Sequence, residues 1–137
     1  MILILSLLLV ANFVGAKNEL LTQGGYCNIA SYVQVNTAEI LNFPPTTNVL
    51  KTFIDTTVIN QVPVFNYEMV LVGTSGYVSH YNEEVNEAFS PGMNFHSYAN
   101  ININSPALNE SYYLKMTLTN QVETVLCYQI NFGVWKI

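Results

Sequence analysis

Apolar and polar residues alternate along much of this chain, and the alternation is clearest near the C-terminus. There, apolar residues occupy every second position on both sides of a break at residues 120–123; they are Tyr112, Leu114, Met116, Leu118, Leu126, Tyr128, Ile130, Phe132 and Val134. Successive side chains of a strand point to opposite faces of a sheet, so these residues share one face. The segment predicts an antiparallel hairpin with one apolar face and one more polar face.

Shorter segments with similar alternation precede this hairpin and are separated by residues that favour turns. They are Tyr32–Asn36, Ala38–Phe43, Val49–Ile59, Val62–Val72, Gly76–Tyr81 and Phe95–Ile103. The polar stretch Asn82–Asn94 is expected to be a long connection with at most one short helical turn. Because helical periodicity is scarce, we expect an all-β domain, and we favour a sandwich of two antiparallel sheets over a small barrel.

The first sixteen residues form a largely apolar run without a charged residue that ends in Val14, Gly15 and Ala16. The run is short for a transmembrane helix, and small residues at its end suit cleavage before Lys17, so residues 1–16 are expected to be a signal peptide. The alternatives are a buried N-terminal strand and an uncleaved anchor. With cleavage, residues 17–137 form a single domain that is secreted or delivered to a vesicular or lysosomal lumen.

Charge is scarce in this chain and its balance is acidic. Only 9% of the residues are charged, the net charge is −5, and no arginine is present. About a quarter of the residues of an ordinary protein are charged, so this chain needs a large interior for its apolar groups. An acidic surface without arginine repels phosphate backbones, which makes nucleic acid a poor partner.

Two cysteines, Cys27 and Cys127, lie near opposite ends of the expected mature chain. In an oxidising compartment such an isolated pair predicts one disulfide, and the alternative is two free, buried thiols. The chain has no CxxC spacing, so we do not expect structural zinc.

Residues with catalytic potential are few. Asp55 is the only aspartate, His80 and His96 are the only histidines, and no serine lies in a GxSxG motif. The cluster Glu83, Glu84 and Glu87 lacks a calcium-loop pattern, and a solvated acidic loop is its simpler interpretation. We therefore expect no enzyme activity, no metal site and no cofactor, although a lipid hydrolase that depends on His80 or His96 stays open.

The one valid glycosylation sequon is Asn109-Glu110-Ser111, in a connection between two expected strands, so Asn109 is a candidate glycan acceptor.

Aromatic residues are abundant, and six of them fall on inward faces: Phe65, Tyr67, Phe95, Tyr112, Tyr128 and Phe132. Such residues line apolar ligand cavities and also fill sandwich cores. Alternation alone favours the filled core.

Several of these segments together resemble the ML lipid-recognition family, nearest its phosphatidylglycerol/phosphatidylinositol transfer proteins and its Niemann-Pick type C sterol carriers. The C-terminal hairpin Tyr112–Val134 resembles the closing hairpin of that family, with a tyrosine at the start of one strand and Cys127 in the middle of the last. Two further segments, Glu39–Ile59 and Ser90–Tyr113, are similar to its proline-bearing loop and Pro-Gly regions. The family usually has additional cysteines, and Ser90 stands where one of them would be expected.

The resemblance implies an immunoglobulin-like β-sandwich with a hydrophobic cavity between its sheets, and a Cys27–Cys127 bridge between its first and last strands. It also implies a protein that binds a phospholipid or sterol, touches membranes transiently and transfers the lipid without catalysis. We expect the protein to be a monomer. The residues expected to line the cavity occupy apolar sides of expected strands; they are Phe65, Met69, Phe95, Ile101, Leu114, Leu118, Ile130 and Phe132. The alternative is an adhesion or receptor-binding module with a filled core.

Overall fold

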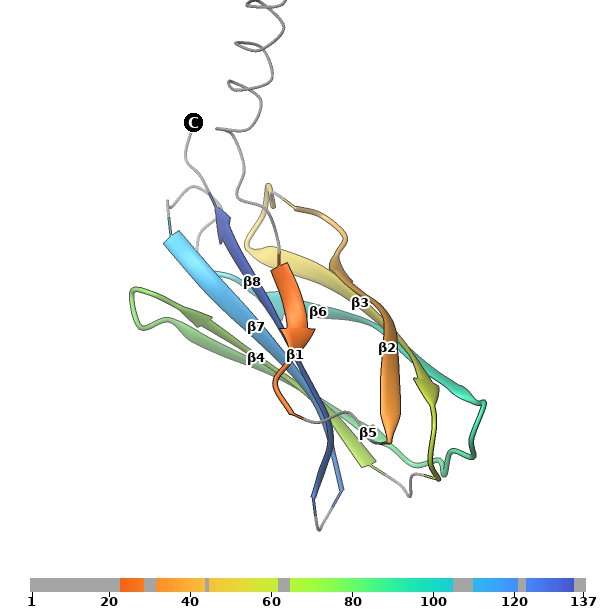
Figure 1. Cartoon of the computed structure of the whole chain (residues 1–137). Helices are drawn as coiled ribbons and strands as arrows, with labels where there is room; N and C mark the ends of the chain where they lie inside the picture. Colours follow the sequence, from red (N-terminus) through yellow and green to blue (C-terminus); the bar gives the residue numbers. More distant parts are fainter. Residues whose placement is uncertain are drawn as a thin grey trace, which may run out of the picture.

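Eight antiparallel strands arranged in two sheets make up the residues that the computed structural model describes, which are 23–28, 32–43, 45–61, 65–104, 110–120 and 123–134 (Figure 1). They are β1 (Gln23–Tyr26), β2 (Val33–Ile40), β3 (Val49–Val58), β4 (Phe65–Gly73), β5 (Val78–Val85), β6 (Asn94–Asn102), β7 (Glu110–Thr119) and β8 (Thr124–Val134). The all-β prediction is confirmed. The expected signal peptide and Asn109 lie outside the described residues.

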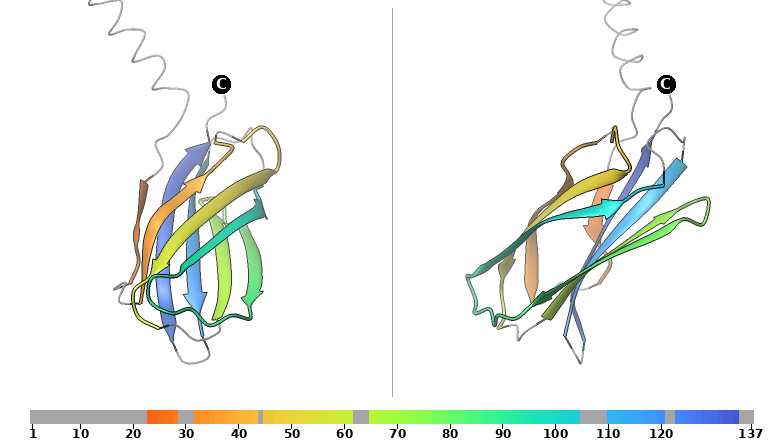
Figure 2. Two further views of the ribbon diagram at one scale, coloured as in Figure 1. Left: turned by 90° about the vertical axis from the view of Figure 1, so that its right-hand side faces the viewer. Right: turned by 180° about the vertical axis from the view of Figure 1, so that it is seen from behind.

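Strand order gives one five-stranded and one three-stranded sheet. The five-stranded sheet has the order β1-β8-β7-β4-β5, and the three-stranded sheet has the order β2-β3-β6. The two sheets face each other as layers whose strands cross at an angle (Figure 2). The expected sandwich of two antiparallel sheets is thus confirmed, and so is the hairpin, in which Leu114 lies opposite Ile130 and Met116 opposite Tyr128.

The alternation in the sequence corresponds to burial in the structure. Along β6, Phe95, Ser97, Ala99 and Ile101 are buried while the residues between them are exposed. Strand β7 alternates in the same way. In both strands successive side chains point to opposite faces of the sheet, so the alternation of apolar and polar residues in the sequence identified the inward faces correctly.

Two expectations about the strands were wrong. The segments expected at Tyr32–Asn36 and Ala38–Phe43 form one strand, β2, because a bulge between Val35 and Thr37 shifts the alternation by one residue. Strand β5 continues to Val85 instead of ending at Tyr81, and residues 86–93 contain no helical turn. Its polar second half is a strand because β4 supplies the backbone pairing, with Glu84 opposite Asn66.

The N-terminal strand β1, which the sequence did not predict, pairs with β8 and is fixed there by a disulfide. Cys27 is bonded to Cys127, so the expected disulfide is confirmed. The backbone N–H of Cys27 also donates to the carbonyl of Cys127 at 2.9 Å, and the Asn28 side chain accepts from the Cys127 N–H at 2.9 Å. Among the described residues we find no helix that could span a bilayer.

Candidate functional site

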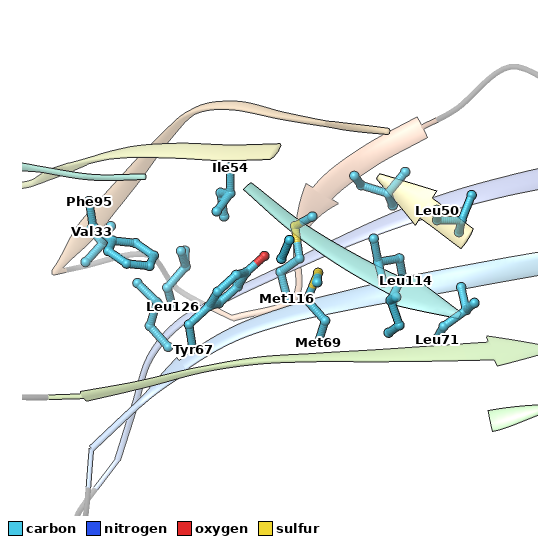
Figure 3. Packing of buried hydrophobic residues seen from close by; sticks show 14 of the residues in the cluster. Val33, Leu50, Ile54, Tyr67, Met69, Leu71, Phe95, Leu114, Met116 and Leu126 are labelled. Carbon is cyan, nitrogen blue, oxygen red and sulfur yellow. The ribbon is translucent and has the colours of Figure 1, made fainter. Parts of the chain in front are cut away.

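Side chains from both sheets meet in a single apolar layer, which we call the interior layer (Figure 3). Its buried members are Val33, Leu50, Ile54, Val58, Tyr67, Met69, Leu71, Phe89, Phe95, Ala99, Ile101, Ile103, Tyr112, Leu114, Met116, Leu118, Val125, Leu126, Ile130 and Phe132. In Figure 3 this layer runs from Phe95 and Val33 at one end, through Met69 and Met116, to Leu50 and Leu71 at the other.

The structure places most of the expected cavity residues in this layer. Met69, Phe95, Ile101, Leu114, Leu118, Ile130 and Phe132 are all buried members. The eighth, Phe65, is the first residue of β4, and its side chain lies outside the described part of the structure. Burial between the sheets is required both for lining a cavity and for filling a core, so their role as cavity residues stays a prediction.

At its centre the interior layer is closed in this conformation. Ile54, Met69, Leu114 and Met116 have no accessible surface. A guest molecule would enter the centre only if the sheets moved apart or if these side chains rearranged. Met69 and Met116 are suited to rearrangement, since methionine is unbranched and adapts to irregular spaces.

The inward face of the three-stranded sheet carries small and hydroxyl-bearing residues at its centre. Thr52, Thr56 and Ser97 are buried there beside Ala99. The hydroxyl of Thr52 donates to the carbonyl of Ala99 at 2.8 Å, and that of Thr56 donates to the carbonyl of Phe95 at 2.9 Å. Both threonines therefore have hydrogen-bond partners in their own sheet, and the Thr52 hydroxyl also lies 3.3 Å from the sulfur of Met69 in the opposite sheet.

Tyr67 projects from β4, near the start of that strand, into the interior layer. Its side chain is 1% exposed, and its hydroxyl has no hydrogen-bond partner among the described residues. Figure 3 shows this hydroxyl pointing away from β4 and into the space between the sheets. Burial raises the pKa of Tyr67 far above its ordinary value, and the neighbouring Tyr81 and Glu83 raise it further.

One end of the interior layer borders a groove between the end of β5 and the start of β6. We call it the β5–β6 groove; it has a volume of about 460 Å³ and is lined by Glu83, Glu84, Val85, Asn86, Glu87, Phe89, Met93, Asn94, Phe95 and His96. Phe89 and Phe95 are buried and also belong to the interior layer, whereas most of the polar lining residues are exposed. The groove thus has an acidic rim above an aromatic floor.

Aromatic contacts lead from the groove floor to Tyr67. The ring of Phe89 meets that of Phe95 edge to face with centroids 6.1 Å apart, and Phe95 meets Tyr67 in the same way at 5.7 Å. Tyr81 also contacts Tyr67, at 6.1 Å, and donates its hydroxyl to Glu83 at 2.9 Å. The groove and the interior are therefore separated by a single layer of aromatic rings.

A buried carboxylate closes the other end of the interior layer. Glu110 accepts the backbone N–H of Ser75 at 2.7 Å and the hydroxyl of Tyr112 at 2.9 Å. The hydrogen bonds from Ser75 and Tyr112 hold the pKa of Glu110 below its ordinary value, against the opposing effect of burial. Gly73 lies against both side chains, and a Cβ at this position would clash with Glu110 and Tyr112. Sequence alternation does not reveal this cluster, because it depends on the turn between β4 and β5.

The remaining residues considered for chemistry are dispersed. His80 is exposed on β5, and Asp55 lies opposite His96 on the outer face of the three-stranded sheet, where it accepts from Asn36 at 3.3 Å. Within the described ranges no three His, Cys, Asp or Glu residues come together in a way that could hold a metal ion.

No family model and no curated protein matches this sequence. Among solved structures, the chain is similar to chicken MD-1 complexed with lipid IVa, with 13% identity and a TM-score of 0.52 over 84% of this chain and 90% of that one. It is also similar to the C-terminal domain of wzt, with 11% identity and a TM-score of 0.52 over 86% and 78% of the two chains. At such identities the likeness shows the fold alone, and that fold is an immunoglobulin-like β-sandwich.

Proposed function

We propose that this protein binds a lipid between its two sheets and carries it between membranes without catalysing a reaction. The observation that carries the proposal is that the β5–β6 groove and the interior layer share two residues, Phe89 and Phe95, and so adjoin each other. An apolar chain that displaces these rings passes from the groove into an apolar interior. Support also comes from chicken MD-1, which holds lipid IVa in a similar fold.

The energy for loading comes from the hydrophobic effect. Each methylene group that leaves water contributes about 0.8 kcal/mol, so a long acyl chain or a sterol offsets the cost of moving the sheets apart. Met69 and Met116 are at the centre of the layer, where a guest would need new space. A carrier of this kind speeds exchange because the lipid tail never has to cross water uncovered.

The rim of the groove favours lipids without net negative charge. It carries Glu83, Glu84 and Glu87, while His96 is its only basic side chain among the lining residues. An anionic headgroup would be repelled by these carboxylates, whereas an uncharged or zwitterionic headgroup would not. We therefore propose a sterol or a zwitterionic phospholipid as the cargo, in preference to phosphatidylglycerol or phosphatidylinositol.

A transfer assay tests this proposal. Donor vesicles contain quenched, fluorescently labelled phosphatidylcholine or phosphatidylglycerol, and the rise in fluorescence measures transfer to unlabelled acceptor vesicles. We expect phosphatidylcholine to move several-fold faster at low salt, where surface charges act most strongly. The double variant Glu84→Gln/Glu87→Gln should lose much of this difference. The matched variant Glu39→Gln/Glu68→Gln removes two charges from outward-facing positions and should keep it. Failure to move either phospholipid would contradict the phospholipid form of the proposal, and failure to move labelled cholesterol in the same assay as well would contradict the carrier proposal.

A second candidate function is an adhesion or receptor-binding module that works through its surface. The closed centre of the interior layer favours it, and so does an aromatic pair on the outer face of the three-stranded sheet. In that pair Phe53 stacks on Tyr98 with centroids 4.5 Å apart, and Tyr98 is 70% exposed. Native mass spectrometry of protein from a eukaryotic host separates the candidates, because co-purifying lipid supports the carrier and clean protein supports the module.

A further inference from the structure

The hydroxyl of Tyr67 differs from those of three other tyrosines in its hydrogen bonding. The hydroxyl of Tyr26 accepts the backbone N–H of Val35 at 2.8 Å, that of Tyr81 donates to Glu83, and that of Tyr112 donates to Glu110. Tyr67 is buried as deeply as any of these, and yet its hydroxyl has no partner within the described part of the chain. A buried hydroxyl without a partner destabilises the protein, and a ligand atom that accepts its hydrogen bond would relieve this cost.

The surroundings offer little to satisfy this hydroxyl. The buried threonines of the opposite sheet, Thr52 and Thr56, already donate to carbonyls of their own sheet. Ser97, buried on the inward face of the three-stranded sheet, also has no hydrogen-bond partner among the described residues, and no hydrogen bond joins it to Tyr67. Phe95, which touches the Tyr67 ring, provides no acceptor atom in its side chain.

The hydroxyl keeps its proton over the whole physiological range, because burial and the nearby Tyr81 and Glu83 disfavour the phenolate. It is therefore available as a hydrogen-bond donor. Its place behind Phe95 means that a molecule entering through the β5–β6 groove meets it early on the way to the centre.

We propose that the Tyr67 hydroxyl donates a hydrogen bond to an oxygen atom that the bound lipid carries into the interior layer. The inference rests on the proposed lipid-binding function and narrows its ligand. The cargo is a lipid whose buried part bears a hydroxyl, carbonyl or ester oxygen, and an all-hydrocarbon chain is bound less well. Tyr67 is thus a specificity-determining residue of the interior.

The test compares two probes that differ in one oxygen atom. Delipidated full-length protein is incubated with phosphatidylcholine vesicles that contain 1-hexadecanol or hexadecane, the vesicles are removed, and the retained probe is quantified by gas chromatography. The ratio of alcohol to alkane is compared between the wild type and Tyr67→Phe, which cancels the different partitioning of the two probes into the vesicles. The control is Tyr98→Phe, which removes an exposed hydroxyl from the outer face of the other sheet.

We expect Tyr67→Phe to lower the alcohol-to-alkane ratio by roughly tenfold, the worth of one well-placed hydrogen bond in an apolar site. Alkane retention should not fall, which shows that the variant is folded and still loads. Tyr98→Phe should keep the wild-type ratio. An unchanged ratio in Tyr67→Phe, with both probes retained, would overturn the inference and leave lipid binding intact. Retention of neither probe by the wild type would overturn the proposed function and the inference together.

Discussion

At the scale of single residues, two buried oxygen-bearing side chains at the two ends of the interior layer differ in their hydrogen bonding. Glu110 has donors for its carboxylate, while Tyr67 has no partner among the described residues. Neither difference is visible in the sequence, because both depend on which groups meet after folding. The alternation of β4 identified Tyr67 as inward-facing but could not show whether it would find a partner, and Glu110 was expected in the connection before β7.

Replacement of Tyr67 by phenylalanine should therefore stabilise the lipid-free protein. Removal of a buried hydroxyl without a partner relieves a desolvation penalty, and we expect a gain of about 1 kcal/mol, or a melting temperature higher by about 4 °C. Tyr112→Phe is the matched control, since it removes a hydroxyl that donates to Glu110 and should destabilise by about 1 kcal/mol. Thermal unfolding followed by circular dichroism measures both. A loss of stability in Tyr67→Phe equal to that in Tyr112→Phe would show that the hydroxyl is satisfied.

Glu110 makes stability depend on pH in the acidic range. Its pKa in the folded protein lies below the ordinary value of 4.5, so the folded state favours the ionised carboxylate. The resulting stabilisation is fully present above pH 4.5 and is lost as the pH falls through the lowered pKa. Urea unfolding at several pH values should show this loss in the wild type. In Glu110→Gln, which cannot ionise, the decline should be smaller, and an equally steep decline would contradict the assignment.

At the scale of strands, the sequence predicts those in which apolar residues recur at every second position over most of the strand. The hairpin β7–β8 and strands β3, β4 and β6 agree with the expected segments within a few residues. Strand β1 was missed because it is short and contains Gly24 and Gly25, and the second half of β5 was missed because its residues are polar. Both are strands because a neighbour in the sheet supplies hydrogen bonds, which is information that local alternation lacks.

The β5–β6 groove could not be predicted for the same reason. Glu83, Glu84 and Glu87 were expected on a solvated loop, and two of them instead belong to β5. The continuity of this acidic rim with Phe89 and Phe95 depends on how β5 and β6, which lie in different sheets, approach one another. Sequence therefore predicted the composition of the interior but not the place where it meets the surface.

Loss of the disulfide should affect β1 more than any other strand. A bridge that closes a loop of 100 residues stabilises the folded state by about 5 kcal/mol in the chain-entropy view. We expect Cys27→Ser/Cys127→Ser to lose most of this stability in urea unfolding. Hydrogen exchange should rise first in β1, which pairs only with β8 and has four residues. Protection of β1 equal to that of β7 in the variant would contradict this order.

At the scale of the whole molecule, the two long edges of the sandwich differ. On one edge the Tyr26 hydroxyl joins β1 of the five-stranded sheet to Val35 in β2 of the three-stranded sheet, close to the disulfide. The other edge, between β5 and β6, contains the groove. Separation of the sheets should therefore occur at the β5–β6 edge, with the β1–β2 edge acting as a hinge.

Hydrogen exchange in the presence of lipid tests this hinge. After loading from phosphatidylcholine vesicles, amides of β5 and β6 should change their exchange rates, while those of β1 and β8 should stay nearly the same. Tyr26→Phe removes the hydroxyl that accepts from Val35 and should increase exchange in β2. Equal changes along both edges on loading would contradict a hinge at β1–β2.

The bond between Cys27 and Cys127 also turns most of the described chain into a closed ring. A protease that cuts one loop inside this ring produces two fragments that remain covalently joined. A nicked molecule would therefore run as a single band on a gel without reductant and would separate only after reduction. Loop cleavage alone could not release either half of the sandwich from the other.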